Sequence, residues 1–323
     1  MVIMQPIKLG VLGTGHLGTH HTRILSQLPG AELVGIHDPD RDKMSKVSTE
    51  YGTRAFNDVD EMLALCEAVV VASPTATHRV VAEKAFLAGC HVLVEKPLAD
   101  SASEGALIVE AAAKAGKTLM VGHIEQFNPA FEAARPIIDK PLFVESHRLT
   151  AYRGRGLDVS VVHDLLIHDL ELLLAILDDE VVSMDASARP ILTDSPDIAN
   201  VRLRFSGGCV ANLTASRISL SNMRKMRLFQ LGAYISIDFG EKTVEIATLG
   251  GGPEPPAGAR KIELTGGESI NLWNIDVPET DALTSELEHF LQSISFGSEP
   301  RVSGKRGLKA LELAEEIIRT AGE

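Results

Sequence analysis

The sequence has few cysteines and no excess of positive charge. Its three cysteines, Cys66, Cys90 and Cys209, are far apart in a chain of 323 residues, and their spacing predicts neither a disulfide framework nor a cysteine-based metal site. The formal net charge of −13 argues against nucleic acid, whose binding relies on clustered Lys and Arg. We therefore expect no metal, no nucleic-acid partner and a reducing cytoplasm.

Long apolar runs are also missing. No segment approaches the roughly 20 apolar residues that a membrane-spanning helix needs, and no charged-then-apolar signal precedes the first apolar strand. We therefore expect no membrane partner. The chain is too long for one typical core, and its hydrophobic fraction of 45% is ample for burying two.

A glycine-rich turn stands near the start of the chain. An apolar run at 7–12 predicts a buried strand, and it breaks into a G-x-G-x-x-G turn formed by Gly13-Thr14-Gly15-His16-Leu17-Gly18. The first glycine permits the tight turn, the second lets the backbone approach a pyrophosphate, and the third allows close helix packing. A second apolar run at 32–36 leads to Asp38, about twenty residues past the turn, where an acid would bind an adenosine ribose. Together these features predict a dinucleotide site.

Strand-like and helical runs alternate through residues 1–124. The predicted strands are 7–12, 32–36, 68–72, 91–94 and 118–121. This alternation predicts an α/β Rossmann domain with a doubly wound parallel sheet. Ligands bind beyond the carboxyl ends of such strands, where the sequence has Asp38, Ser73, Pro74, Thr75, Glu95, Lys96, Pro97, Gly122 and His123.

Residues 125–323 follow a different pattern. Strand-like runs occur at 143–152, 181–189, 198–205, 209–218, 225–231, 235–238 and 243–247. They predict an α+β domain with a large, mainly antiparallel open sheet. An apolar helix is expected over 161–177, and the helix at 305–321 is a candidate to pack back on the first domain.

Lys96 and a histidine–aspartate pair could carry chemistry. Lys96 follows a buried strand, so its ammonium can hydrogen-bond a substrate hydroxyl or lower the pKa of a neighbouring base. Asp164 and His168 are four apart on the expected helix and would share one face. A histidine can act as general base, with a carboxylate holding its tautomer. A metal site using His163 and Asp169 with this pair is weaker, because no H-E-x-x-H is present.

Other polar residues leave two interpretations open. His123, Gln126 and Asn128 could line the nicotinamide end of the cleft or simply form the linker between domains. Arg148, Arg153 and Arg155 could bind a phosphate through their guanidinium forks, or belong to a solvated loop.

These motifs together resemble the Gfo/Idh/MocA oxidoreductase family. The resemblance rests on GTGHLG at 13–18, Asp38, SPTATH at 73–78, EKP at 95–97 and the pair Asp164 and His168. It implies a Rossmann domain at 1–124 and a substrate-binding and oligomerisation domain at 125–323. It also implies hydride transfer between NAD(P) and a sugar or cyclitol carbon, and a homodimer or homotetramer formed through the C-terminal sheet.

The family pattern also implies roles for single residues. Lys96 would contact substrate and the nicotinamide ribose, Asp164 would orient the reacting centre, and His168 would be the acid/base. The implied cofactor-binding residues are Gly13, Thr14, Gly15, His16, Leu17, Gly18, Asp38, Arg41, Ser73, Pro74, Thr75, His78, Glu95, Lys96 and His123. Asp38 favours NAD over NADP because a carboxylate repels a 2′-phosphate, although Arg41 weakens that preference.

Two stretches are similar to one branch of the family. GHIEQFNP at 122–129 and VVHDLLIHD at 161–169 are similar to a branch that oxidises the 3-hydroxyl of UDP-N-acetylglucosamine, in which an arginine stands where this chain has Gln126. The implied substrate contacts are Arg153, Arg155, Asn128 and His163. The alternatives are a dehydrogenase or reductase of a free sugar or inositol, and a non-catalytic NAD-binding sensor or corepressor.

Overall fold

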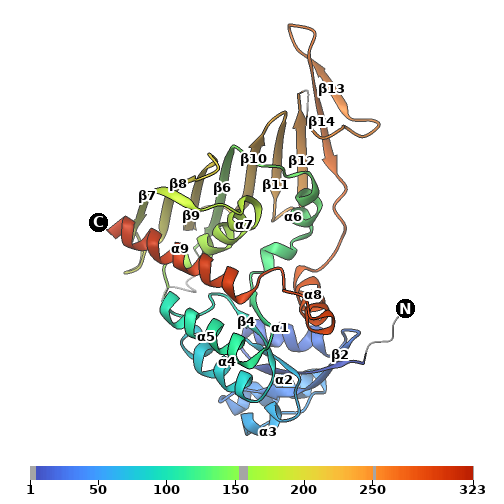
Figure 1. The fold of residues 1–323 in the computed structure, drawn as a ribbon, viewed down its shortest axis with the longest axis vertical. Coiled ribbons are helices and arrows are strands. Elements are labelled where there is room, and N and C mark those ends of the chain that lie inside the picture. The colour runs from blue at the N-terminus through green and yellow to red at the C-terminus, as the bar shows by residue number, and fades with distance from the viewer. Residues whose placement is uncertain (1–4, 153–158, 250–251, 323) are drawn as a thin grey trace. The chain divides into compact units, whose positions relative to one another are not determined.

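The chain folds into two compact units. The computed structural model describes residues 5–152, 159–249 and 252–322, shown in Figure 1. Unit 1 comprises Met1–Ile124 and Ala282–Glu312, and unit 2 comprises Glu125–Asp281 and Leu313–Glu323. The division after residue 124 lies where the sequence predicted a domain boundary, but the segment 282–312 joins the first unit rather than the second.

Unit 1 contains a five-stranded parallel sheet in the order β2-β1-β3-β4-β5. The strands are β1 (Ile7–Leu12), β2 (Ala31–His37), β3 (Ala68–Val71), β4 (His91–Glu95) and β5 (Leu119–Gly122). A parallel bridge between Ile36 and Ala55 adds a sixth position beside β2. With this bridge the strand order is that of a Rossmann sheet, and the order reverses between β1 and β3, where dinucleotides bind.

Helices follow the strands of unit 1 as the sequence predicted. They are α1 (His16–Leu25), α2 (Arg41–Tyr51), α3 (Val59–Leu63), α4 (His78–Leu87) and α5 (Ala102–Ala115). The side chains of Asp40 and Ser101 accept hydrogen bonds from the first turns of α2 and α5, and left-handed glycines end both helices. Every residue of β3 and β5 is buried, as expected of strands covered on both faces.

Two helices from the end of the chain complete unit 1. They are α8 (Ala282–Phe296) and the first part of α9 (Gly304–Gly322). Leu287 and Phe290 of α8 are fully buried. A Cβ atom at Gly307 would meet Val121 Cγ2 at 2.5 Å, so α9 passes against β5 closely. The N-terminal part of α9 thus belongs to unit 1.

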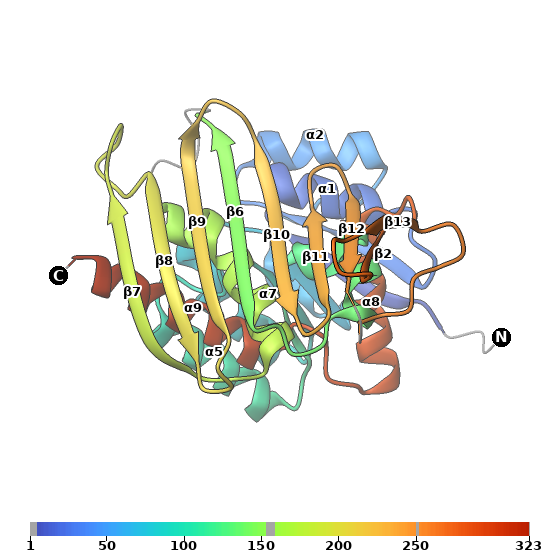
Figure 2. The ribbon, with the colours of Figure 1, turned by 90° about the horizontal axis from the view of Figure 1, so that it is seen from above.

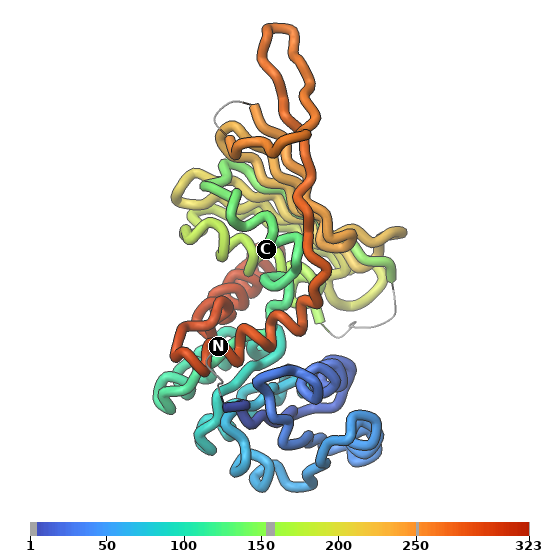
Figure 3. Tube along the Cα trace, turned by 90° about the vertical axis from the view of Figure 1, so that its right-hand side faces the viewer, coloured from blue at the N-terminus to red at the C-terminus, as the bar shows by residue number. Residues whose placement is uncertain are grey.

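Unit 2 contains a nine-stranded sheet in the order β13-β14-β12-β11-β10-β6-β9-β8-β7. All neighbouring strands are antiparallel except β6 and β9, which are parallel. The strands are β6 (Phe143–Ala151), β7 (Val181–Arg189), β8 (Ile198–Phe205), β9 (Val210–Ser219), β10 (Met223–Gln230), β11 (Ala233–Asp238), β12 (Thr243–Thr248), β13 (Arg260–Glu263) and β14 (Ser269–Ile275). The β13–β14 hairpin, which the sequence did not predict, extends beyond the other strands (Figure 3).

The two faces of this sheet differ. Helices α6 (Pro129–Ala134) and α7 (Ile167–Leu177) lie on one face, and the strands stand in front of them in Figure 2. Alternate residues of β8 follow this division, because Val201 and Leu203 are fully buried while Asn200 and Arg204 are exposed. Among the described residues, no helix is long and apolar enough to cross a membrane.

Candidate functional site

The glycine turn has the geometry that a pyrophosphate site needs. Gly13 has a φ of 101°, and a Cβ there would lie 2.6 Å from the Ala72 carbonyl oxygen. A Cβ at Gly18 would collide with the carbonyl of Gly13. At Gly15, in contrast, an added Cβ would meet nothing within 4 Å. The turn is therefore tightly packed at Gly13 and Gly18, whereas space remains at Gly15, immediately before the first amides of α1. This space fits a bound diphosphate.

Asp38 is fixed at the end of β2 by hydrogen bonds. Its Oδ2 accepts from the Thr14 amide at 2.6 Å and from the Thr14 hydroxyl at 2.9 Å, and its Oδ1 accepts from the Asp40 amide at 2.8 Å. The Thr14 side chain is buried, so its visible role is to orient Asp38. This carboxylate beside the glycine turn fits an adenosine ribose. Arg41 lies exposed at the start of α2.

His78 links the loops that follow β3 and β4. Its Nε2 lies 2.9 Å from the Ser73 carbonyl oxygen, and its Nδ1 lies 3.0 Å from the Pro97 carbonyl oxygen. Burial lowers the pKa of His78, an effect larger than the opposing one of the carbonyl groups. The His78 side chain is buried, whereas Pro74 is exposed and Thr75 half-buried. His78 thus stabilises the conformation of the loops after β3 and β4. Pro74 and Thr75 remain accessible to a ligand.

Glu95 is the last residue of β4, and Lys96 follows it directly. The Glu95 side chain is buried, and its Oε1 lies 2.6 Å from His21 Nε2. Lys96 is half-buried, and the Lys96–Pro97 peptide bond is cis. His123 is buried, and burial together with the positive charges of Lys96 and Arg306 lowers its pKa to about 3. His123 is therefore a neutral imidazole at physiological pH.

Asp164 and His163 lie in a π-helical turn. The turn spans Val162–Leu166, and α7 continues from Ile167 to Leu177, so the expected helix over 161–177 is present but begins with a π turn. Hydrogen bonds in a π turn join residues five apart. The spacing of four between Asp164 and His168 therefore does not by itself put them on one face. Both residues and His163 are half-buried. Single π turns inside helices occur frequently at functional sites.

An arginine that the sequence left as a phosphate candidate holds α7 instead. Arg148 donates from Nε and Nη2 to the two carboxylate oxygens of Asp169, at 3.0 and 2.8 Å, and from Nη1 to Glu125 at 2.7 Å. Its side chain is buried. Burial alone would lower the pKa of Arg148, but the two carboxylates outweigh it and raise the pKa. The Arg148 guanidinium is therefore engaged by two carboxylates, and it fixes the residue that follows His168.

A second buried ion pair holds the start of the helix. Asp197 accepts from Arg217 Nε at 2.8 Å, and Arg217 Nη1 donates to the Val159 carbonyl at 2.6 Å. The Val161 amide donates to the Pro196 carbonyl at 2.9 Å. Burial raises the pKa of Asp197, but the amides of residues 191–193 and the Arg217 guanidinium together hold it below its usual range. No local sequence pattern identified this pair.

Gln126 and Asn128 have internal roles in unit 2. Gln126 is fully buried, and its Nε2 donates to Glu171 Oε2 at 2.7 Å. Asn128 is buried as well; its Oδ1 caps α6 at the Ala130 amide, and its Nδ2 donates to Glu125. The proposed role of Asn128 as a substrate contact has no support in these bonds. Arg153 and Arg155 lie outside the described residues.

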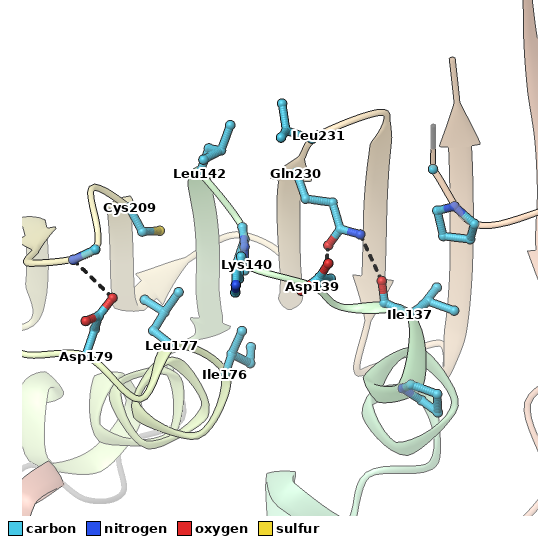
Figure 4. A pocket seen from close by; sticks show the side chains of 15 residues that line it. Ile137, Asp139, Lys140, Leu142, Ile176, Leu177, Asp179, Cys209, Gln230 and Leu231 are labelled. Atoms are coloured by element: carbon cyan, nitrogen blue, oxygen red, sulfur yellow. Dashed lines mark hydrogen bonds between the residues drawn. The ribbon is translucent and has the colours of Figure 1, made fainter. Parts of the chain in front are cut away.

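A hollow in unit 2 contains none of the predicted site residues. It has a volume of about 870 Å³ and is lined by residues that include Lys140, Leu177, Cys209 and Gln230 (Figure 4). Gln230 fixes one wall, because its amide donates to the Ile137 carbonyl and accepts from the Asp139 amide, both at 2.9 Å. Burial raises the pKa of the Cys209 thiol to about 11, so it is not a thiolate at neutral pH.

Comparisons with known proteins match both units. Residues 7–123 match the family model described as "Oxidoreductase family, NAD-binding Rossmann fold", and residues 121–231 match the Gfo/Idh/MocA C-terminal domain. The chain is 33% identical to UDP-N-acetylglucosamine 3-dehydrogenase of Acidithiobacillus ferrooxidans, over 97% of each chain. It is 27% identical to inositol 2-dehydrogenase of Rhizobium meliloti, over 98% of this chain and 97% of the relative.

The similarity to this relative is also seen when the structures are compared. The Acidithiobacillus ferrooxidans UDP-N-acetylglucosamine 3-dehydrogenase superimposes with a TM-score of 0.89 at 32% identity, covering 98% of both chains. The likeness therefore includes the nine-stranded sheet and the C-terminal helices, and extends beyond the nucleotide-binding unit.

Proposed function

The chain belongs to the Gfo/Idh/MocA oxidoreductase family, and from that premise we propose that it oxidises the 3-hydroxyl of UDP-N-acetylglucosamine to a 3-keto sugar. The chain is an NAD-dependent dehydrogenase with an NAD-binding Rossmann domain. The observation that carries the substrate is the 33% identity over nearly the full length of a UDP-N-acetylglucosamine 3-dehydrogenase. The relatives are dehydrogenases, which disfavours the sensor or corepressor alternative.

The proposed reaction removes a hydride and a proton from one secondary alcohol. NAD, which the glycine turn and Asp38 would hold, would supply the acceptor for the hydride on the carbon that bears the hydroxyl. The imidazole of His168 takes the hydroxyl proton as general base. The Lys96 ammonium stabilises the negative charge that develops on the oxygen. Asp164 orients the reacting centre, and Arg148 supports His168 by holding the adjacent Asp169.

The buried Gln126 bears on the choice of substrate. The arginine of the similar branch would matter for substrate if that side chain reached the sugar. Gln126 is fully buried and donates to Glu171, so its place is in the interior of unit 2. The replacement of arginine by glutamine therefore gives no reason to abandon the nucleotide sugar.

The substrate is tested by following NADH formation with the purified protein. We expect UDP-N-acetylglucosamine to give a kcat/KM above that of N-acetylglucosamine or myo-inositol by at least about a hundredfold, because a site built around polar groups rejects ligands that leave them unpaired. Turnover of inositol without turnover of the nucleotide sugar would instead assign the chain to the inositol dehydrogenase activity named for the Rhizobium meliloti relative.

We also propose that the sheet face opposite α6 and α7, on which the described residues form no helix (Figure 2), joins two copies of the chain. We call it the helix-free face. This face has a polar hollow of about 410 Å³ lined by residues that include His147, Asn200, Arg202 and Thr214. Arg202 donates to Asn212 at 2.7 Å, and Asn200 donates to Thr214 at 2.9 Å. Side chains that are already ordered by such bonds lose little further freedom on association. The proposal makes the protein a homo-oligomer.

A further inference from the structure

Three ionisable side chains meet in the interior of unit 1, behind the turn that carries Lys96. They are His21 on α1, Glu95 at the end of β4 and Glu286 on α8, and all three are buried. One nitrogen or oxygen from each lies within 4.8 Å of the others. This cluster contains two carboxylates and one imidazole, that of His21.

Glu286 is the unusual member of the cluster. Its side chain is fully buried, and neither carboxylate oxygen accepts a hydrogen bond from a donor among the described residues. An ionised carboxylate in that position would be costly, because it is removed from water and left unpaired. Either a proton or a cation must therefore neutralise it.

The geometry favours a proton. His21 Nε2 and Glu95 Oε1 are 2.6 Å apart, which is a short hydrogen bond. Two ligands of one tetrahedral zinc ion, each about 2.0 to 2.2 Å from the metal, would be roughly 3.3 Å apart. The distance between His21 Nε2 and Glu95 Oε1 therefore suits a shared proton. A metal ion bound by both atoms would require them to move apart. Glu286 is left with the Glu95 carboxylate as its neighbour.

We propose that Glu286 stays protonated at neutral pH and that its carboxylic acid O–H donates a hydrogen bond to the Glu95 carboxylate. This bond positions the turn that presents Lys96. The titratable groups that face it are His21 from α1 and Glu95 from β4. Glu95 also accepts from the Lys96 amide through Oε2 at 3.3 Å, so the position of this carboxylate is coupled directly to the backbone of Lys96. Burial, followed by the nearby charge of Glu95, raises the pKa of Glu286 well above its ordinary value.

The proton has a consequence for stability that does not depend on the enzyme's substrate. The unfolded chain releases this proton above the ordinary pKa of a glutamate, whereas the folded protein keeps it. The free energy of unfolding therefore falls as pH rises above the ordinary value, until the raised pKa of the folded state is reached. One retained proton increases the unfolding constant by up to about tenfold for each pH unit in that window.

The first test compares urea unfolding of the wild-type protein with Glu286→Gln between pH 5 and pH 9. The amide remains neutral and can still donate to Glu95, so the variant should lack the tenfold change per pH unit and become relatively more stable as pH rises. Glu288→Gln, at an exposed position of the same helix, is the matched control and should keep the wild-type slope. Equal slopes for Glu286→Gln and wild type would overturn the proposal.

The second test works even if the variant does not fold. Infrared spectra of the wild-type protein at pH 8 should contain the carbonyl band of a protonated carboxylic acid, and the absence of that band would overturn the assignment. Elemental analysis should find no stoichiometric metal. If the wild-type protein contained one equivalent of metal and Glu286→Gln contained none, the proposal would be overturned, because a cation would then neutralise Glu286.

The positioning of Lys96 rests on the proposed function and is tested by activity. Glu286→Leu should lower kcat with NAD and the nucleotide sugar by about tenfold, the loss of one hydrogen bond to a charged group, and Glu286→Gln should restore most of it. Unchanged kcat in Glu286→Leu would overturn the positioning role. If no variant and no wild-type sample turned over any sugar, the proposed function would fail, while the unfolding and infrared results would still decide the protonation of Glu286.

Discussion

Lys96 and His168 make separate contributions to the proposed reaction, so their removal should have separate effects. His168→Ala should lower kcat by about 10² to 10⁴, the range for a lost general base. Lys96→Ala should lower it by roughly 10² to 10³, the range for one lost group that stabilises an oxyanion. Lys114→Ala, at an exposed position of α5, is the control. Near-normal turnover in both site variants would refute the assigned roles.

Asp38 should decide the choice between NAD and NADP. Its carboxylate is held rigidly by Thr14 and Asp40, and like charges that are forced together cost several kcal/mol. We expect wild-type kcat/KM with NAD to exceed that with NADP by roughly a hundredfold. Asp38→Asn keeps an acceptor oxygen for Thr14 and should narrow the ratio to about tenfold or less. A wild-type preference for NADP, measured from initial rates, would contradict this role.

Residues within short motifs could be identified from the sequence, whereas their distant partners could not. The roles of Gly13, Gly15 and Gly18 follow from spacing alone, and each has the predicted geometry. Arg148 is different, because the sequence does not indicate that its guanidinium meets Asp169, 21 residues later. Glu286 is an ordinary helical glutamate in the sequence. Its burial becomes visible only when α8 is placed beside α1 and β4.

At the scale of elements, the start of the helix that contains Asp164 and His168 depends on the pair Arg217 and Asp197. Arg217→Met should reduce the free energy of unfolding by about 3 to 5 kcal/mol, because it leaves a buried carboxylate unpaired. It should also lower kcat, since the Val159 carbonyl loses its donor. Arg23→Met, at an exposed position of α1 in unit 1, should change neither. Urea unfolding with kinetics on the same samples measures both effects.

The ion pair of Asp197 and Arg217 should make the free energy of unfolding depend on pH. The folded-state pKa of Asp197 lies below its usual range, so the stabilisation is complete above the ordinary pKa of an aspartate and is lost as pH falls below it. Wild-type protein should therefore lose stability below about pH 4 more steeply than Asp197→Asn. Parallel acid unfolding curves for the two proteins would contradict this assignment.

Elements with a strong local pattern were predicted well, and those set by tertiary contacts were not. The ranges 181–189 and 198–205 coincide with β7 and β8 because apolar and polar residues alternate there. The π turn at Val162–Leu166 could not be predicted, because its apolar content suits an α-helix equally well. The hairpin β13–β14 has many half-buried or exposed residues, so it lacks the contrast that identifies a strand.

At the scale of the whole molecule, the helix-free face of the sheet predicts the state of association. Light scattering after gel filtration should give a mass two or four times that of one chain. Thr214→Glu places a charge in the polar hollow of that face and should shift the mass towards a single chain. Lys46→Glu, at an exposed position of α2 in unit 1, should leave it unchanged. A monomeric wild-type protein at micromolar concentration would contradict the proposed interface.

Unit 1 is built from both ends of the chain, and this affects the order in which the protein can be completed during synthesis. Residues up to Ile124 leave the ribosome long before residues 282–312, which supply α8 and the part of α9 that packs on β5. Until then Val121 and its neighbours lack their cover, and Glu286 is absent from its place beside Glu95. In a nascent chain, unit 1 therefore cannot complete its fold until residues 282–312 have been synthesised. A fragment designed to bind NAD by itself must contain residues 282–312 joined to residues 1–124.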